Sequence, residues 1–422
     1  MKMYNDTQLE RKTMKILLAF DKFKHSLTSA EAAEAARAGV LDAFHDRGIK
    51  TEPIITVLPA ADGGEGTVQA FLSAMHGETV LCNVTPPHLL PDTEEKIAAV
   101  YAVFETDTTL HPHGFAGDTI KCEKMAVMEM AAASGLGLVP DAQRNPMQTS
   151  TYGTGEMIRH ALDRGIRRFL LGLGGSATND LGCGMASALG ARFYDADGNR
   201  IMAPTGGDLL RIHDIDLSAL DARLAECTFI ACCDVENPLC GERGAAAVYG
   251  PQKGAKPEDI AVLDRGLAHI AALLNTKYSI DIADIPGSGA AGGMGGGVIA
   301  FLSGGLTRGI DAVLDAVNLT AQLACADLLL TGEGRLDAQT VCGKTVCGIL
   351  RRAKDAAVPV MVFGGCIEEE AYALYSMGAA GIFALCDRPM TAAESMEQAG
   401  ILLRRRVRGA VGCFLAGNKA DM

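Results

Sequence analysis

One pattern recurs along this 422-residue sequence: a short apolar run, a turn rich in glycine or acidic residues, and then a stretch typical of a helix. In residues 14–44 the run Ile16–Phe20 is apolar throughout, and Ser29 stands where it can cap an alanine-rich helix. The pattern returns at 52–75, and further apolar runs follow at 325–337, 358–366 and 379–387. A run that is apolar at every position is typical of a parallel strand buried on both faces. The pattern therefore predicts an α/β fold with a doubly wound parallel sheet.

The length of the chain predicts two domains, because one hydrophobic core rarely covers so many residues. We expect a discontinuous Rossmann-like domain of residues 14–75 plus 285–422, and an α/β domain of residues 76–284 inserted into it. Residues 1–13 are polar and lack the apolar segment of a signal peptide, so we expect a disordered extension there. In such folds ligands bind beyond the carboxyl ends of strands and between domains, which predicts an active site in the cleft between the two.

The net charge limits the kinds of molecule that this protein can bind, and the cysteine content indicates its cellular compartment. The net charge of −13 argues against nucleic acids and anionic membranes as partners. The 13 cysteines are odd in number and scattered, which is typical of reduced thiols in a cytoplasmic protein. No stretch is apolar for long enough to span a bilayer. We expect a cytoplasmic protein that acts on a small molecule; the sequence leaves open whether it forms a homo-oligomer.

Polar residues directly follow five of the apolar runs. They are Asp21, Lys22, Lys24 and Ser26; Asp62 and Glu65; Ser176, Thr178, Asn179 and Asp180; Asp234 and Asn237; and Glu333, Arg335 and Asp337. A single aspartate after a strand is usually a turn former or a helix cap, but five such strand ends are harder to explain that way. Carboxylates hold Mg²⁺, while lysines and backbone amides neutralise transferring phosphate oxygens. These residues alone predict a Mg²⁺-dependent, phosphate-handling enzyme.

The glycine turn GLGGSA, residues 172–177, admits a second interpretation. It matches a dinucleotide fingerprint after a strand, and Asp195 and Asp197 lie about twenty residues further on, as in a nicotinamide-binding site. An NAD-dependent dehydrogenase is therefore the alternative function. Two features count against it: polar residues crowd the turn, and the fingerprint lies in the middle of the chain. Exposed amides at such a turn favour an anion in either case.

Two further glycine-rich segments carry weaker signals. VCGKT, residues 341–345, resembles the end of a phosphate-binding P-loop, but the position that requires its first glycine is Ala338, so we reject that motif. The glycine block at 286–297 permits either close backbone approach to a ligand or a hinge between domains. Its glycines Gly289, Gly292 and Gly293 are candidate nucleotide-binding residues.

A series of longer blocks resembles the bacterial glycerate kinase family of the glycerate 2-kinase type. They are FDKFKHSLTSAEAAEAARAG (20–39), ADGGEGT (61–67), EMAAASGL (129–136), RNPMQTSTYGTGEMI (144–158), LGLGGSATNDLGCGMASALG (171–190), CDVENPLCGERGAAAVYGPQKGA (233–255), GSGAAGGMGGG (287–297) and TGEGRLDAQTVCGK (331–344). The blocks stand in the family's order and cover most of the chain from Met14 to about Gly365. The resemblance implies two α/β domains and phosphorylation of D-glycerate to 2-phosphoglycerate with ATP and Mg²⁺.

The resemblance marks these polar residues as a set, and the chemistry of phosphoryl transfer predicts their individual roles. The turn with Gly174, Gly175, Ser176 and Asn179 should hold a phosphate or the glycerate carboxylate. Asp180 or Asp234 should act as the catalytic base or as a metal ligand, and Lys24 should stabilise the transferring phosphate. The remaining candidates are Asp21, Ser26, Asp62 and Glu65 for substrate or phosphate, Glu333 and Asp337 for the nucleotide, and Asp62, Asp234 and Glu333 for the metal.

Three departures from the family pattern leave the substrate open. Lys22 and His25 stand where the family usually has serine and glycine, which places bulk and charge beside Lys24. Residues 85–122, which read as a loop or an edge hairpin, have TPPHLL where the family has a Gly-Pro-Leu-Gly turn. A kinase of another small hydroxy acid therefore stays a second alternative.

Overall fold

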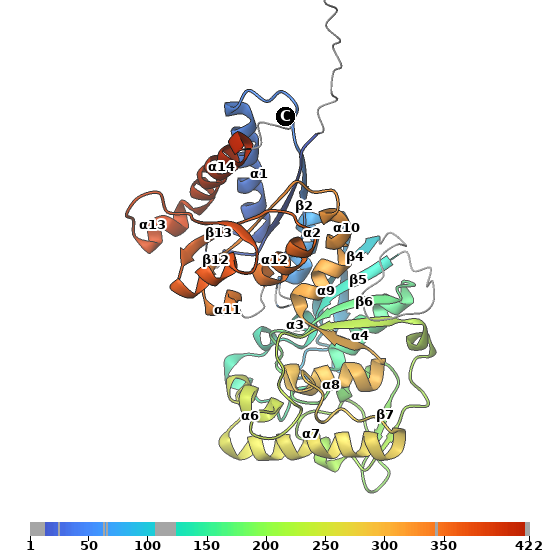
Figure 1. Cartoon of the computed structure of the whole chain (residues 1–422). Helices are drawn as coiled ribbons and strands as arrows, with labels where there is room; N and C mark the ends of the chain where they lie inside the picture. The colour runs from blue at the N-terminus through green and yellow to red at the C-terminus, as the bar shows by residue number, and fades with distance from the viewer. Residues whose placement is uncertain are drawn as a thin grey trace, which may run out of the picture. The chain divides into compact units, whose positions relative to one another are not determined.

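The computed structural model describes residues 13–23, 26–61, 64, 66–105, 124–341 and 345–417. Strands alternate with helices along much of the chain, and most strand pairs are parallel, which confirms the predicted α/β class (Figure 1). The chain divides into two compact units: unit 1 comprises Met1–Ala60 and Val317–Met422, and unit 2 comprises Ala61–Ala316. The extension expected at residues 1–13 lies outside the described residues, apart from Thr13.

These boundaries differ from the expected ones, which placed 14–75 plus 285–422 in one domain and 76–284 in the other. Helix α2 (Thr67–Ala74) packs on β3, β4 and β5 of unit 2, and Val68 N donates a hydrogen bond to Glu129 Oε1 at 2.8 Å. Residues 285–316 also belong to unit 2, because β11 (Gly305–Thr307) pairs with its neighbour β10 there. A strand followed by a helix looks like one unit in sequence, yet here the helix packs on a different sheet.

Unit 1 is built on a five-stranded parallel sheet in the order β2–β1–β12–β13–β14. Its strands are β1 (Lys15–Phe20), β2 (Ile54–Val57), β12 (Leu328–Leu336), β13 (Val360–Ile367) and β14 (Ala379–Ala384). The chain runs outward from β1 to β2, and later outward from β12 in the opposite direction. Strand order therefore reverses between β1 and β12, and open α/β sheets bind ligands at such a switch point, beyond the carboxyl ends.

Helices α1 (Ser29–Asp46) and α14 (Ala399–Gly417) pack side by side against this sheet (Figure 1). Ile16, Leu18 and Phe20 contribute to the core beneath them, in keeping with the two-residue period of a strand. The cap of α1 is Thr28, one residue before the expected Ser29: its hydroxyl accepts from Glu31 N. The other helices of unit 1 are α10 (Leu319–Leu323), α11 (Ala338–Val341), α12 (Thr345–Asp355), α13 (Ala392–Glu397) and the 3₁₀ helix η6 (Glu369–Tyr375).

The close approach of α1 and α14 gives a matched pair of glycine substitutions. A Cβ atom on Gly39 of α1 would lie 2.4 Å from Arg404 O, whereas one on Gly409 of α14 would meet nothing within 4 Å. Gly39→Ala is expected to lower the free energy of unfolding by roughly 1–3 kcal/mol through overpacking. Gly409→Ala should raise it by up to about 1 kcal/mol, because alanine is the better helix former. Urea unfolding followed by circular dichroism compares the two, and equal shifts would contradict the close contact.

Unit 2 contains a six-stranded mixed sheet in the order β11–β10–β6–β5–β4–β3. Besides β11, its strands are β3 (Gly77–Val84), β4 (Ile97–Glu105), β5 (Lys124–Glu129), β6 (Arg168–Gly172) and β10 (Thr228–Cys232). Strands β5, β6, β10 and β11 are parallel, so their carboxyl ends lie along one edge. Strands β3 and β4 form an antiparallel hairpin at one edge of the sheet. Of residues 85–122, expected to be a loop or an edge hairpin, 85–96 form the loop of this hairpin and 97–105 form β4; residues 106–123 lie outside the description.

The rest of unit 2 surrounds this sheet. A small sheet, in the order β8–β7–β9, consists of β7 (Arg192–Tyr194), β8 (Arg200–Ile201) and β9 (Asp214–Asp216). The α-helices besides α2 are α3 (Ala131–Ser134), α4 (Tyr152–Asp163), α5 (Cys183–Ala188), α6 (Ala245–Tyr249), α7 (Pro257–Tyr278), α8 (Ala290–Leu302) and α9 (Gly309–Ala316). The 3₁₀ helices are η1 (Leu136–Leu138), η2 (Asp141–Gln143), η3 (Leu209–Arg211), η4 (Ala222–Glu226) and η5 (Pro251–Lys253).

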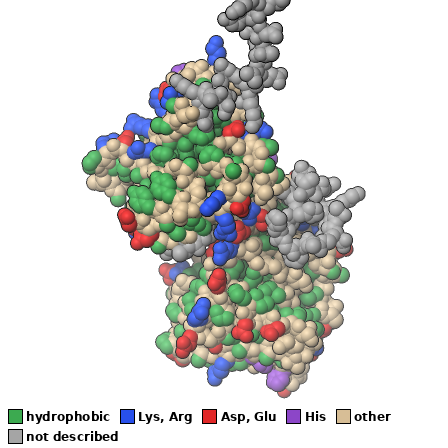
Figure 2. All heavy atoms as spheres, viewed as in Figure 1, with side chains coloured by type: hydrophobic (Ala, Val, Ile, Leu, Met, Phe, Trp, Pro, Cys, Tyr) green, Lys and Arg blue, Asp and Glu red, His purple; other side chains and the backbone are tan. Residues whose placement is uncertain are grey.

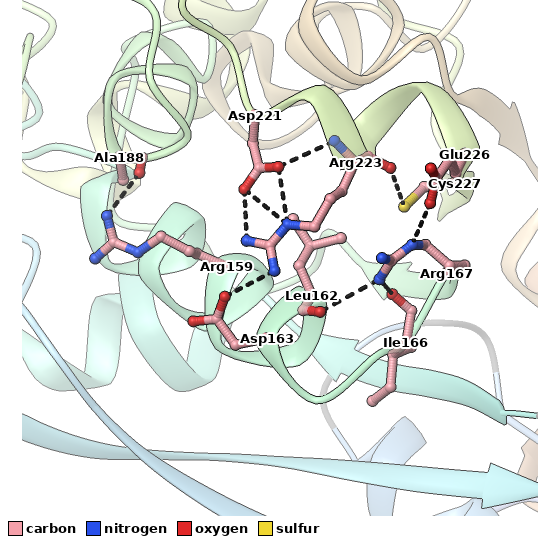
Figure 3. A network of polar contacts seen from close by, with 10 residues as sticks. All are labelled: Arg159, Leu162, Asp163, Ile166, Arg167, Ala188, Asp221, Arg223, Glu226 and Cys227. Atoms are coloured by element: carbon pink, nitrogen blue, oxygen red, sulfur yellow. Dashed lines mark hydrogen bonds and ion pairs between the residues drawn. The ribbon is translucent and has the colours of Figure 1, made fainter.

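An ion-pair network joins the end of α4 to η4, close to where β6 and β10 begin (Figure 3). Arg223 Nη2 donates to Asp221 Oδ2 at 2.6 Å, and its Nη1 lies 2.8 Å from Asp163 Oδ1 on α4. Arg167, directly before β6, donates from Nε to Glu226 Oε2 at 3.0 Å, two residues before β10. The hydrogen bonds that the Arg223 guanidinium donates to Asp221 and Asp163 raise its pKa. The network links the segments just before the two strands whose far ends carry the glycine turn and Asp234.

Over the described residues, none of the helices combines the length and the apolar character that a membrane crossing requires. On the face drawn in Figure 2, acidic and basic side chains are scattered among each other.

Candidate active site

Unit 2 has a pocket of about 430 Å³ at the carboxyl ends of β6 and β10. This volume is within the usual range for small-molecule sites. The turn after β6, the segment after β10, η5 and the start of α8 all contribute to its wall. Among the lining residues are Gly174, Gly175, Ser176, Asp234, Tyr249 and Lys253. The structure therefore brings together four residues that the sequence analysis proposed: the two glycines, Ser176 and Asp234.

Lys253 lines this pocket although only 2% of the residue is exposed. Its Nζ donates to Ser176 Oγ at 2.8 Å and to Thr178 O at 2.7 Å. Among the described residues, no carboxylate lies within ion-pair distance of the ammonium group. Burial lowers the pKa of Lys253 to about 7, and the negative charge of Asp180 opposes that shift. Two neutral partners thus hold the amine of Lys253 against the glycine turn.

The lowered pKa of Lys253 predicts how the stability of the ligand-free protein depends on pH. In the unfolded chain the amine stays protonated up to its ordinary pKa of 10.5, whereas in the folded chain it loses its proton near pH 7. Between these values the unfolded state binds more protons, so this group makes the free energy of unfolding rise with pH, by up to about 1.4 kcal/mol per unit.

Chemical denaturation between pH 7 and 9 measures this slope. The difference between the wild-type protein and Lys253→Met isolates the contribution of the one amine, because every other titrating group is common to both. Identical slopes in the two proteins would contradict the lowered pKa.

Asp234 lies two residues beyond the end of β10. Its Oδ1 accepts a hydrogen bond from Gly309 N, at the start of α9, at 2.9 Å. This contact orients the carboxylate, which also lines the pocket. The neighbouring Cys233 lines the pocket too, but burial raises the pKa of its thiol, so it is a poor nucleophile. Asp234 is thus the acidic group of the described pocket wall.

Asp180 is placed differently from Asp234. It is fully buried and is not among the lining residues of the pocket. Its Oδ2 accepts hydrogen bonds from Thr151 N at 2.8 Å, Thr151 Oγ1 at 2.7 Å and Gly184 N at 3.2 Å, and its Oδ1 accepts from Gly182 N at 3.3 Å. Burial raises the pKa of this carboxyl group, while these donors oppose the shift. In this structure Asp180 ties the loop after β6 to the segment before α4.

The candidate glycines Gly289, Gly292 and Gly293 do not line the pocket, whereas Ala290 and Ala291, which stand among them, do. Gly292 has a φ of +72°, and a Cβ there would lie 2.0 Å from Thr178 O. The absence of a side chain therefore allows the start of α8 to lie against the loop after β6.

Asn179, another candidate, is fully buried and does not line the pocket either. Its side-chain nitrogen and oxygen have no hydrogen-bond partner among the described residues.

In unit 1 the candidate residues gather at the switch point between β1 and β12. Asp21, directly after β1, accepts a hydrogen bond at Oδ2 from Thr345 Oγ1 at 2.9 Å. Glu333 on β12 accepts at Oε1 from Thr340 Oγ1 at 2.8 Å, and Asp337 caps α11 by accepting from Thr340 N at 3.2 Å. Ser26 donates to Phe23 O within a tight turn. Three other candidates, Lys24, Asp62 and Glu65, lie outside the described residues, as does His25.

The described residues contain no cluster of three or more histidine, cysteine or carboxylate side chains that would enclose a metal ion. Mg²⁺ does not need such a cage, since it commonly keeps several waters and binds one or two carboxylates together with substrate phosphates. The carboxylates at the ends of β1 and β12 fit a Mg²⁺ ion that arrives with a nucleotide. Of the three predicted metal ligands, Asp234 lies in unit 2, Glu333 lies in unit 1 and Asp62 is not described.

The dinucleotide interpretation of residues 172–177 is wrong. In a dinucleotide site a helix begins at the glycine turn and directs its amino terminus at the pyrophosphate. Here the chain continues as a loop after Gly175, and helix α5 begins only at Cys183. Lys253 donates to Ser176 and Thr178 of that loop, where a dinucleotide site would have the first turn of its helix.

Sequence reasoning missed Tyr249, Gln252 and Lys253, which line the pocket from α6 and η5. They follow none of the apolar runs that the sequence analysis assigned to strands, so their place in the sequence did not indicate a shared pocket. The sequence signal that could have indicated them is Lys253, which stands between Pro251 and Gly254 within the block 233–255 that resembles the family.

Comparison with known proteins places these features in a family. The model of the glycerate kinase family matches residues 16–414. The glycerate kinase of Halalkalibacterium halodurans is 42% identical over 393 residues, which is 93% of this chain and 96% of that protein. The glycerate 2-kinase of Escherichia coli K12 is 41% identical over 372 residues, which is 88% of this chain and 90% of the relative. A glycerate kinase 2 crystal structure from Salmonella typhimurium LT2 is similar with a TM-score of 0.80 at 41% identity, covering 96% of this chain and 100% of that one.

Proposed function

Because this chain belongs to the glycerate kinase family and is a phosphotransferase, we propose that it transfers the γ-phosphoryl group of ATP to D-glycerate, with Mg²⁺, and yields 2-phosphoglycerate. The observation that carries the proposal is that Asp234, the Gly174–Ser176 turn and Lys253 line one pocket. A carboxylate, a turn of backbone amides and a lysine are the groups needed to bind a small hydroxy acid and remove the proton of its hydroxyl.

In the proposed reaction Asp234 is the general base. The proton of the C2 hydroxyl passes to its carboxylate, and the hydroxyl oxygen forms a bond to the γ-phosphorus. The bond between the γ-phosphorus and the β–γ bridging oxygen breaks, so ADP leaves with the electron pair. The Gly309 N–H keeps Asp234 Oδ1 in place, which holds the base in one orientation during this step.

The nucleotide is proposed to use the residues at the switch point of unit 1. Glu333 lies in the last half of β12, Asp337 directly follows that strand, and Asp21 directly follows its neighbour β1. When bound, Mg²⁺ neutralises charge on the phosphates and polarises the transferring group. The role of these side chains is to hold the ion through one or two carboxylates, as Mg²⁺ sites with substrate phosphates usually do.

A coupled assay of ADP release with D-glycerate, ATP and Mg²⁺ tests the proposal, and phosphorus NMR of the product identifies the phosphorylated hydroxyl. We expect the enzyme to form one ADP for each molecule of 2-phosphoglycerate. A product phosphorylated at C3 would refute the assigned position and leave the transferase intact. If ADP forms only with another small hydroxy acid, that acid and not D-glycerate is the substrate. The first positions to mutate would then be the departures from the family pattern at Lys22, His25 and residues 85–122.

A further inference from the structure

The wall of the unit 2 pocket carries one positive and one negative side chain among its described residues, Lys253 and Asp234. Asp234 has a backbone donor at Gly309 and a proposed role as base. Lys253 has no such assignment. A buried ammonium group is costly unless a partner compensates its charge. The partners found for Lys253 among the described residues are both neutral, the Ser176 hydroxyl and the Thr178 carbonyl.

The position of Lys253 is fixed by its surroundings. It ends the 3₁₀ helix η5, and the next residue, Gly254, has a φ of +93°, with Arg144 O only 2.2 Å from where a Cβ would stand. Only glycine fits there, so the turn holds the lysine in one place. An ammonium group has three N–H donors. Two are used within the protein, which leaves one for a ligand in the pocket.

We propose that Lys253 binds the carboxylate of the acceptor and makes the enzyme specific for hydroxy acids over uncharged polyols and amides. This inference rests on the proposed function and names the group that selects its substrate class. The neighbouring turn supports the assignment, because Gly174, Gly175 and Ser176 line the pocket beside the lysine and offer backbone amides. Ammonium and amide donors together are the usual surroundings of a bound carboxylate.

The charges of the pocket favour a carboxylate over the phosphates of ATP. A monoanion bound at Lys253 is neutralised by one lysine, and its hydroxyl is then available to Asp234. A triphosphate with several negative charges would meet the Asp234 carboxylate in the same pocket, where like charges repel. The ammonium therefore matches the acceptor of the reaction better than the donor.

Replacing the lysine while varying the substrate tests this inference. We would measure kcat/KM for D-glycerate and for D-glyceramide, its uncharged amide, in the wild-type enzyme and in K253M. Loss of a charge-assisted hydrogen bond should lower kcat/KM for D-glycerate roughly 10- to 150-fold. The value for D-glyceramide should change less than about threefold, because the amide has no charge to lose, and KM for ATP should stay the same.

Two further variants serve as controls. K253Q keeps a donor for Ser176 or Thr178 but has no charge, so it should show the same loss of discrimination even if K253M fails to fold. K256M removes an exposed lysine three residues away and should leave both substrates unaffected. Equal losses on both substrates would overturn the inference and leave Lys253 as a structural residue. A rise in KM for ATP alone would overturn it in favour of a phosphate ligand.

Calorimetric binding separates this inference from the proposed function. If the wild-type enzyme transfers no phosphate to D-glycerate, the proposed function fails, yet the binding of D-glycerate and of inorganic phosphate to wild type and K253Q still decides the role of the lysine. Binding of D-glycerate that K253Q abolishes supports the inference. Equal binding to both proteins, or a loss confined to inorganic phosphate, overturns it.

Discussion

Asp234→Asn is expected to lower kcat for D-glycerate by about 100-fold or more while KM changes little. Loss of a positioned general base usually has an effect of this size. The amide oxygen of asparagine can still accept the hydrogen bond from Gly309 N, so the loop after β10 should keep its conformation. Steady-state kinetics with D-glycerate and ATP measure the effect, and circular dichroism checks the fold.

Glu236→Gln is the matched control for this substitution. Glu236 stands two residues further along the same loop, with 78% of its side chain exposed and only a distant ion pair to Arg308 at 3.9 Å. Neutralising it removes the same charge from the same segment and should leave kcat within about twofold, since exposed pairs contribute little. Near-normal turnover in Asp234→Asn would exclude this residue as the base.

Asp180→Asn is expected to act mainly on stability, lowering the free energy of unfolding by roughly 2–4 kcal/mol. All four hydrogen bonds of this buried carboxylate come from donors, and two of them come from Thr151. An asparagine presents an NH₂ group on one side, which faces a donor and leaves a buried hydrogen bond unmade, at a cost of about 1–3 kcal/mol for each group so affected. Urea denaturation measures the loss.

A comparison with Asp195→Asn shows whether burial is the reason for the loss of stability expected in Asp180→Asn. Asp195 also accepts backbone hydrogen bonds, from Asp197 N at 3.0 Å and Asn199 N at 2.8 Å, but it is only partly buried and these bonds are exposed, so water can replace the lost contacts. Its replacement should cost less than about 1 kcal/mol. If Asp180→Asn unfolds like the wild type but loses 100-fold in kcat, Asp180 has a catalytic role after all and the structural assignment is wrong.

Part of the candidate pocket wall was predictable, because the sheet itself places it. Parallel strands deliver whatever follows them to one edge, so Asp21 after β1, Ser176 after β6 and Asp234 after β10 were accessible from the apolar runs alone. Of these, Ser176 and Asp234 do line one pocket. It stays a prediction that residues of both units take part in a single reaction.

The remainder depends on contacts between segments that no local pattern reveals. Lys253 reaches Ser176 from a 3₁₀ turn 77 positions away, and its importance arises from burial, which the sequence does not display. Asp180 and Asp234 are both acidic residues that follow a strand, so the sequence does not distinguish them. In the structure Asp180 is buried and bonded chiefly to Thr151, whereas Asp234 lines the pocket. Helix α2 was assigned to the wrong sheet for the same reason, since its bond to Glu129 spans 61 positions.

The insertion of unit 2 between β2 and β12 sets an order of events during synthesis on the ribosome. Strand β1 reaches its second neighbour only when β12 has been made, and Thr331 bonds to Ala19 across 312 positions. Unit 2, by contrast, is one continuous segment, Ala61–Ala316, which can fold as soon as it emerges. The sheet of the first-made segment is therefore completed last, and at about 5–20 residues per second β1 spends many seconds with an open edge. In this chain the unit that contains the amino-terminal strand is therefore the last to be completely synthesised.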